Sequence, residues 1–393
     1  MNAGADGPNQ HYLYAMLLQY TGKIAQAESV LEACLHRWPR FGDAAVALAN
    51  LRTQSIEANH IDILRKLSRS IPFDSQSSDK RMARAGFESA LFKELDDLGN
   101  HDEAWQALSR SNALMHSISP YDKVGETAIT DELIRIFGYI DAEREAPLHR
   151  FDGSIPIFIV GMTRSGTTLL DRMLSNHSQV VSAGEINDFR RQLHWMTDTA
   201  QGGIPNLLEV FRRTEGINYA ELGARYLEQT QWRALDKRFY IDKLPINIRM
   251  VPFIRMALPH APILHLVRDP MDVCFSNFKA MLGPVSAYSY DMQSLAHYYG
   301  EYARLVGHWH AVMPGAMFDV SYASLVCDTE ATLRKVLMHC GLEWEESCLR
   351  PERNTAPVAT PSSAQVREPI YTRSLGEWRR YATQLEPLRK MIT

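Results

Sequence analysis

"IPIFIVGMTRSGTTLLDRML", residues 155–174, joins an apolar run to a short glycine-containing loop and then to a segment with helical spacing. The apolar run predicts a buried strand, and "TTLLDRMLSNH", which begins at Thr167, predicts a helix. At such a junction, backbone N–H groups and a helix N-terminus can converge on an anion, and glycines allow the chain to approach it closely. The stretch therefore predicts an anion-binding loop in an α/β fold.

The loop differs from a nucleotide-binding P-loop at one position. Gly161 and Gly166 have the P-loop separation, but Thr167 stands where a P-loop has Lys. Arg164 is the cation within the loop, and its planar guanidinium suits bidentate contacts with phosphate or sulfate. The loop thus has the means to hold an anion without the ammonium that an NTPase places on the β and γ phosphates.

A second strand and helix follow later in the chain. "APILHLVRDP", residues 261–270, predicts another buried strand, and "MDVCFSNFKAML", residues 271–282, predicts the helix after it. Apolar strands without alternation, each followed by a helix, are typical of a parallel sheet covered on both faces.

The first ~145 residues have the three-and-four spacing of helices. Leu18, Gly22, Ala27 and Leu31 recur as Leu95, Gly99, Ala104 and Leu108, each 77 positions later. That separation is about two 34-residue tetratricopeptide (TPR) repeats plus a short insertion, with a degenerate repeat between them. An ordinary helical bundle with glycines in its turns remains the alternative.

The sequence pattern changes from that of helices to that of strands and turns near Pro147, Gly153 and Pro156. We therefore predict an all-α TPR-like domain over residues 1–148 and a P-loop-like α/β domain over residues 149–393.

The composition limits the classes of partner. The chain has 393 residues and a formal net charge of −4, which favours two domains and no polyanionic partner such as nucleic acid. We found neither a leader pattern nor a long apolar run, so we expect no membrane and a cytoplasmic location. Five scattered cysteines without a CxxC pair indicate reduced thiols, and no His spacing suggests a metal site.

Two motifs together resemble the sulfotransferases. In that family, "RSGTT" after a strand binds the 5′-phosphosulfate of 3′-phosphoadenosine 5′-phosphosulfate (PAPS), and this chain has Arg164, Ser165, Gly166, Thr167 and Thr168. The family's second motif is an Arg at a strand end and a Ser eight positions later, which hold the 3′-phosphate. "LVRDPMDVCFSNF" supplies Arg268 and Ser276. The order and the strand-to-helix context of both motifs agree with the family.

The resemblance implies further site residues. "AGEINDF" is similar to a Gly-Glu segment of tyrosylprotein sulfotransferases, which implies Glu185 as the acceptor base, and "DKLP" implies Lys243 at the bridging oxygen or sulfuryl group. Tyr322 corresponds to a nucleotide-pocket tyrosine. A looser similarity near the C-terminus implies that Arg373 and Ser363 reach the 3′-phosphate.

The resemblance also implies the reaction. PAPS is the donor, 3′-phosphoadenosine 5′-phosphate (PAP) is the product, and the sulfuryl group passes in line to a hydroxyl without a required metal ion. Positioning and cations at the leaving oxygen do most of the work in such transfers, so we expect Arg164 and Lys243 to contribute alongside Glu185. The acceptor is a peptide tyrosine, a glycan or a natural product. The TPR-like part either binds a protein or mediates homodimerisation.

Other interpretations remain open from the sequence. A P-loop kinase or NTPase would use Asp269 for a metal, and a catalytically silent TPR scaffold would need no chemistry at all. For single residues, Glu185 can instead cap the helix near Asn187, Arg268 can pair with Asp269, and Lys243 can be an ordinary turn lysine.

Overall fold

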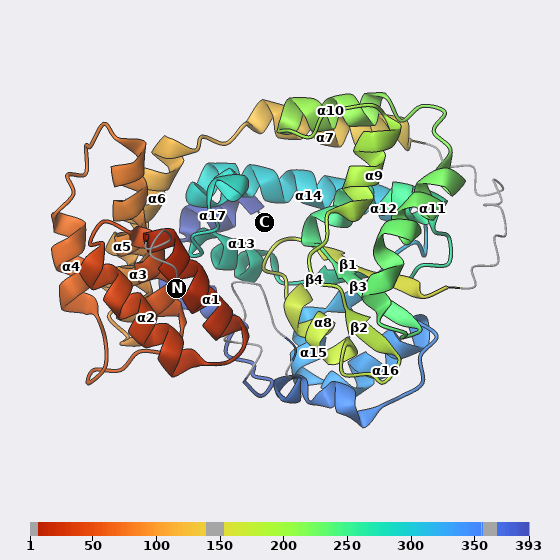
Figure 1. Ribbon diagram of the computed structural model, residues 1–393. Helices are drawn as coiled ribbons and strands as arrows, with labels where there is room; N and C mark the ends of the chain where they lie inside the picture. Colours follow the sequence, from red (N-terminus) through yellow and green to blue (C-terminus); the bar gives the residue numbers. More distant parts are fainter. Residues whose placement is uncertain (1–6, 139–152, 355, 357–367, 393) are drawn as a thin grey trace.

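The computed structural model describes residues 7–138, 153–354, 356 and 368–392. A sheet of five parallel strands, in the order β2-β3-β1-β4-β5, forms the centre of the C-terminal part (Figure 1). The strands are β1 (Ile155–Gly161), β2 (Val180–Ser182), β3 (Phe239–Lys243), β4 (Ile263–Val267) and β5 (Phe318–Ser321). The predicted parallel α/β sheet is confirmed.

Helices cover both faces of this sheet, as the continuous apolar strands require. Phe158 and Tyr240 belong to one face, and Ile157 and Ile241 to the other. The first face packs against α9 (Asp188–Met196), α10 (Ile204–Arg212), α11 (Tyr219–Thr230), α12 (Val251–Ala257) and α14 (Met292–Val312). The second face packs against α8 (Thr167–Leu174), α15 (Tyr322–Cys327) and α16 (Thr329–His339). The sheet core is therefore sealed from water on both sides.

Short 3₁₀ helices complete the α/β part. They are η1 (Gln231–Ala234), η2 (Pro245–Met250), η3 (Pro284–Tyr290), η4 (Glu346–Leu349), η5 (Pro351–Arg353) and η7 (Glu377–Tyr381).

The N-terminal part is helical, as predicted (Figure 1). Its helices are α1 (Pro8–Tyr20), α2 (Ile24–Arg37), α3 (Gly42–Asn50), α4 (Ile61–Arg69), α5 (Ser78–Asp97), α6 (His101–Ile118) and α7 (Lys123–Ile136). Gly22 turns the chain between α1 and α2 with φ 80°, and Gly99 does so between α5 and α6 with φ 77°. Ala27 and Ala104, which follow these turns, are completely buried. The two predicted repeat units thus have equivalent turns and contacts, while their TPR-like character stays a prediction.

The helical and α/β parts share one apolar core. Residues of α1 to α6 form a single buried cluster with α13 (Pro270–Phe278) and α17 (Glu386–Ile392). Trp105 of α6 stacks on Phe278 with ring centroids 5.8 Å apart, and Asn112 donates a hydrogen bond of 3.0 Å to the Phe278 carbonyl. The buried Tyr381 hydroxyl donates to Asp96 over 2.7 Å. Figure 1 shows α13 and α17 between the two parts.

Helix α7 leaves the other N-terminal helices and reaches the sheet side, where it lies beside α10 (Figure 1). Its residues Ile129 and Leu133 are buried in the same cluster as Phe158 of β1. The predicted boundary at residue 148 lies outside the described residues and stays a prediction.

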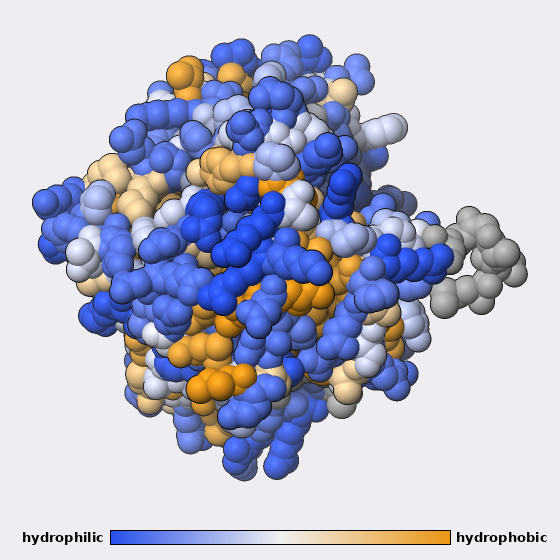
Figure 2. All heavy atoms as spheres, turned by 90° about the vertical axis from the view of Figure 1, so that its left-hand side faces the viewer, coloured by the Kyte–Doolittle hydropathy of each residue, from blue (hydrophilic) through white to orange (hydrophobic). Residues whose placement is uncertain are grey.

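The surface formed by the N-terminal helices is largely hydrophilic, with hydrophobic areas between the polar side chains (Figure 2). Leu13, Tyr14 and Leu17 are exposed apolar side chains of α1. Among the described residues, no helix combines the length and apolar character needed to cross a membrane.

The close crossing of α3 and α5 at Gly42 and Gly86 leads to a testable prediction. A Cβ on Gly86 would lie 2.8 Å from backbone atoms of Gly42, so Gly86→Ala must push the two helices apart. We expect the free energy of unfolding to fall by about 1–3 kcal/mol, although Ala is the better helix former. Gly307→Ala in α14, where no atom lies within 4 Å of the added Cβ, is the control and should stabilise the chain by up to ~1 kcal/mol. Urea unfolding of the two variants measures both, and equal effects would disprove the close-crossing argument.

Candidate active site

Predicted site residues follow the carboxyl ends of all five strands. The anion loop follows β1, Glu185 follows β2, and Lys243 is the last residue of β3. Arg268 and Tyr322 directly follow β4 and β5. In parallel sheets, ligands bind outside this edge, at the point where neighbouring strands send their connections in opposite directions. Strands β1 and β4 are such neighbours, because β1 connects to β2 on one side and β4 to β5 on the other.

The loop after β1 has the backbone of an anion cradle. Arg164 has φ 68° and Gly166 has φ 106°, both in the left-handed region, and α8 begins immediately afterwards at Thr167. A Cβ on Gly166 would lie 2.3 Å from the ring of Tyr322, so only glycine fits at this position. Ser165 and Thr167 are buried, and Thr168 is half-buried in the first turn of α8. The backbone N–H groups of that first turn are available to a ligand at the helix N-terminus.

The second motif begins α13 in a defined way. The Asp269 carboxylate accepts a hydrogen bond of 3.0 Å from the Asp272 amide and caps the helix, and Pro270 occupies its first position. Asp269 therefore acts as a helix cap, and the sequence-level alternative of an Arg268–Asp269 ion pair is not found among the described contacts.

The structure brings the two motifs into direct contact. Arg164 Nε donates to Ser276 Oγ over 3.3 Å, and Arg268 Nη1 donates to the Arg164 carbonyl over 3.0 Å. Asn277, next to Ser276 on α13, donates to the Thr163 carbonyl over 2.8 Å. Helix α13 thus holds the loop after β1 from the side.

This contact places two guanidinium groups next to each other. Burial lowers the pKa of Arg164, and the neighbouring charge of Arg268 lowers it further. The Nε atom of Arg268 is buried with no hydrogen-bond partner among the described residues. Two adjacent cations in a partly buried site are stabilised by an anion, which also satisfies orphaned N–H groups. The residues present therefore fit the anionic groups of a phosphorylated ligand.

A C-terminal segment closes the other side of the cradle. Arg268 Nη2 donates to the Ser374 carbonyl over 2.7 Å, and the Tyr322 hydroxyl lies 2.7 Å from Ser374 Oγ. The Gly376 amide donates to Asp272 over 2.9 Å. The guanidinium carbon of Arg268 also lies 4.7 Å from the centre of the Tyr322 ring. Arg268 therefore contacts the Ser374 carbonyl, the Tyr322 ring and the Arg164 carbonyl.

One predicted residue of this segment, Arg373, is not brought into the cradle. Arg373 lies over the ring of Tyr371, with its guanidinium carbon 3.8 Å from the ring centre, and forms an ion pair with Glu368. Its side chain is 60% exposed, which separates it from the buried contacts of Arg268. Ser363 lies outside the described residues.

Lys243 and Glu185 form an ion pair at the ends of β3 and β2. The Lys243 side chain is 1% exposed, so it is not an ordinary turn lysine, whereas Glu185 is 44% exposed. Asp171 of α8 lies close by: burial raises the pKa of its carboxyl, and the charge of Lys243 opposes that rise. Lys243 therefore pairs with the Glu185 carboxylate and also acts on the Asp171 carboxyl through its charge.

Glu185 is open to solvent and paired with Lys243, although Val180, Val181 and Ala183 before it are apolar. The alternative role as a helix cap is also not found, because α9 begins at Asp188 with Asn187 as its cap residue. The exposure leaves the carboxylate accessible to a second substrate.

Sequence analysis missed three residues of the site: Asp171, Asn277 and Ser374. Asn277 directly follows a predicted residue, and Asp171 lies one helical turn after Thr167, so positions in the two motifs' helices were the available signal. Ser374 acts through its carbonyl as well as its hydroxyl, and no sequence pattern reveals a backbone contact.

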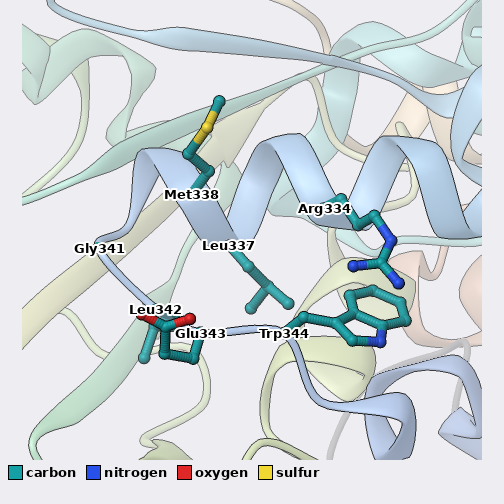
Figure 3. A pocket seen from close by; sticks show the side chains of 7 residues that line it. All are labelled: Arg334, Leu337, Met338, Gly341, Leu342, Glu343 and Trp344. Atoms are coloured by element: carbon teal, nitrogen blue, oxygen red, sulfur yellow. The ribbon is translucent and has the colours of Figure 1, made fainter.

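A surface hollow at the C-terminal end of α16 lies apart from these residues (Figure 3). Its lining includes Leu337, Gly341 and Trp344, and the Arg334 guanidinium lies over the Trp344 ring at 4.0 Å. None of the predicted site residues lines it.

Comparison with known proteins agrees with the geometry. The sequence profile of the sulfotransferase family matches residues 156–346. The chain is 27% identical to the protein-tyrosine sulfotransferase of Drosophila melanogaster over 271 residues, which are 64% of this chain and 50% of that protein. It is 29% identical to an uncharacterized protein of Aquifex aeolicus (strain VF5) over 320 residues, 79% of this chain and 41% of that protein. The chain thus spans half or less of the length of these two relatives.

A solved structure is also similar: the sulfotransferase domain from the Synechococcus PCC 7002 olefin synthase. The similarity covers 60% of this chain and 90% of that domain, with 19% identity and a TM-score of 0.42.

The contact of Gly166 with Tyr322 can be tested. In Gly166→Ala the added methyl group collides with the ring, so the loop must move away from Tyr322. We expect PAP to bind at least about tenfold more weakly, a loss of ~1.4 kcal/mol or more. Gly216→Ala, which also has positive φ (76°) but no atom within 4 Å of the Cβ, controls for backbone strain alone. Calorimetric titration with PAP should find unchanged affinity in the control, and unchanged affinity in Gly166→Ala would contradict the close approach.

Proposed function

We propose that this chain, whose residues 156–346 match the sulfotransferase family profile, transfers a sulfuryl group from PAPS to a hydroxyl of its acceptor, with PAP as the nucleotide product. The observation that carries the proposal is the joined cradle. The loop after β1 and the start of α13 are bonded to each other through Arg164, Arg268 and Ser276. Two anion sites at neighbouring strand ends suit a cofactor with anionic groups on both sides of one adenosine.

We assign the 5′-phosphosulfate to the loop and the 3′-phosphate to the second motif. In this assignment Arg164, Ser165, Gly166, Thr167 and Thr168 bind the first group through the loop and the first turn of α8. The second group binds to Arg268 and Ser276, and Tyr322 packs against the loop and against Arg268. PAPS supplies the activated sulfuryl group, so no metal ion is needed to polarise it.

The proposed reaction gives separate roles to Lys243, Arg164 and Glu185. Lys243 and Arg164 offer positive charge where charge grows on the leaving oxygen, and each such donor typically contributes ~3 kcal/mol to lowering the barrier. Glu185 takes the proton from the acceptor hydroxyl, and its 44% exposure allows an acceptor to reach it. The contact between Glu185 and Lys243 orients both groups toward the same reacting centre.

The class of the acceptor is inferred from similarity to a relative. The similarity to a protein-tyrosine sulfotransferase favours a peptide tyrosine, and a glycan or natural-product hydroxyl suits the same base. We propose that residues 1–148 form a TPR-like domain that binds a protein acceptor or mediates homodimerisation. Incubation with radiolabelled PAPS and panels of peptide, glycan and lipid acceptors separates these classes.

A nucleotide kinase is the second candidate, but the site favours it less. Asp269 caps α13, and Thr167 replaces the P-loop Lys. A kinase would bind ATP with magnesium more tightly than PAP, whereas a sulfotransferase should bind PAP and react without added magnesium.

Glu185→Gln tests the base. We expect turnover to fall by about 10²- to 10⁴-fold, because the amide cannot accept the proton, while affinity for PAP stays unchanged. Glu209→Gln is a matched control, since Glu209 is also 44% exposed and paired with a basic residue, here Arg213. Transfer rates from PAPS and calorimetry with PAP measure the two effects. Full activity of Glu185→Gln would remove it from the mechanism.

Arg164→Ala tests the cradle. The change removes the contact with Ser276 and one of two adjacent cations, so we expect weaker PAP binding and a turnover lower by about 10²- to 10³-fold. Arg213→Ala, at an exposed arginine that directly follows α10, serves as the control. If Arg164→Ala binds PAP as tightly as the unaltered chain does, the nucleotide does not bind at this cradle.

A further inference from the structure

His265 is a buried histidine in the middle of the apolar strand β4. It is 2% exposed and points to the sheet face covered by α14, where a charged or unpaired imidazole is unfavourable without partners. Two side chains from other elements supply them: Asp319 of β5 and Tyr302 of α14. His310 of α14 in turn contacts Asp319. This cluster is outside the proposed active site and has no part in the reaction described above.

The cluster contains two imidazoles and one carboxylate that face each other. His265 Nδ1 lies 2.8 Å from Asp319 Oδ1, and His310 Nε2 lies 3.3 Å from Asp319 Oδ2. The possible metal-ligand atoms of His265, His310 and Asp319 all lie within 4.8 Å of one another. Asp319 and His310 are 47% and 39% exposed, so solvent and ions can reach the donors from the surface, while His265 closes the inner side.

Tyr302 holds the inner histidine from behind. Its hydroxyl lies 2.6 Å from His265 Nε2, the ring nitrogen that faces away from Asp319. Burial raises the pKa of Tyr302, and a hydrogen bond from the Met162 backbone opposes that rise. Histidines that bind metals usually have their second ring nitrogen fixed by such a partner, which orients the ring and sets its tautomer.

We propose that His265, His310 and Asp319 form a binding site for one divalent transition-metal ion, with Zn²⁺ best matched to the donors. Two histidines and a carboxylate, with an open fourth position for water, form a common zinc donor set. At zinc–ligand distances of about 2.0–2.2 Å, tetrahedral ligand atoms lie about 3.3 Å apart. The separation of His310 Nε2 and Asp319 Oδ2, 3.3 Å, agrees with this value, whereas that of His265 Nδ1 and Asp319 Oδ1, 2.8 Å, must lengthen on binding. Binding replaces the contact between His265 Nδ1 and Asp319 Oδ1, and protons released by the ligand groups go to solvent.

The position of this site suggests a structural role. His265 and Asp319 are paired in the register of β4 and β5, three residues before Arg268 and Tyr322, respectively. An ion that links β4, β5 and α14 therefore fixes the ends of the two strands that carry cofactor-site residues. Sequence spacing does not reveal the site, because its ligands come from two strands and a helix and meet only after folding.

Zinc titration of the full chain, after treatment with EDTA and dialysis, tests the proposal. We expect one equivalent of Zn²⁺ to bind at micromolar or lower concentration, and Co²⁺ to give the visible absorption of a four-coordinate ion. His310→Ala and Asp319→Asn should abolish the binding or weaken it by at least about tenfold, and Tyr302→Phe should weaken it by roughly 10- to 100-fold. Circular dichroism checks that each variant is folded.

Two controls separate this site from others. His308→Ala removes a histidine of the same helix that bonds the Phe137 carbonyl instead, and should leave binding unchanged. Glu28, Glu32 and His60 form the other group of possible ligands among the described residues, so Glu32→Gln should also bind like the unaltered chain. The proposal is overturned if the unaltered chain binds no zinc at these concentrations, if His310→Ala and Asp319→Asn bind it normally, or if Glu32→Gln loses it. These measurements need no sulfuryl transfer, so they stand apart from the proposed function.

Discussion

The packing of α13 against the N-terminal helices is the constraint on which the anion cradle depends. One side of this helix contributes Phe275 and Phe278 to the core of α1 to α6, where losing a buried aromatic ring typically costs ~3–5 kcal/mol. The same helix carries Ser276 and Asn277, which contact Arg164 and the Thr163 carbonyl. Any rotation of α13 that followed a loss of this packing would move both contacts away from the loop. The helical part therefore supports the cradle directly, in addition to any role in binding partners.

The C-terminal segment adds a second connection between the two parts. It bonds Arg268 through the Ser374 carbonyl, then continues to Tyr381, which is completely buried beside Asp96 of α5. The cradle is thus held between the anion loop, α13 and a segment anchored in the helical core. The hydrogen bonds of the Arg268 guanidinium go to the carbonyl oxygens of Ser374 and Arg164, which compete less with an anionic ligand than a hydrogen-bonded carboxylate would.

Sequence predicted the elements better than their contacts. The apolar strands, the two strand-to-helix motifs and the glycines of both repeat units stand in continuous patterns, so the parallel sheet, its helical neighbour and the meeting of Arg164 with Ser276 could be expected. The exposure of Glu185 and its pairing with Lys243 could not, because they depend on how β2 and β3 end relative to each other. Asp171 and Ser374 were missed for the same reason: their partners are distant in sequence or are backbone atoms.

Charge is distributed unevenly along the carboxyl edge of the sheet. The ends of β1 and β4 gather the guanidinium groups of Arg164 and Arg268, whereas Glu185 and Asp171 lie toward β2 and β3, with Lys243 between the two groups. In an in-line transfer, the leaving oxygen needs positive charge and the attacking hydroxyl needs a base on the opposite side. A donor held by the arginines and an acceptor beside Glu185 meet these two requirements at once. In the proposed reaction, Lys243 lies where negative charge moves during transfer, which gives a reason for an almost completely buried lysine at the end of β3.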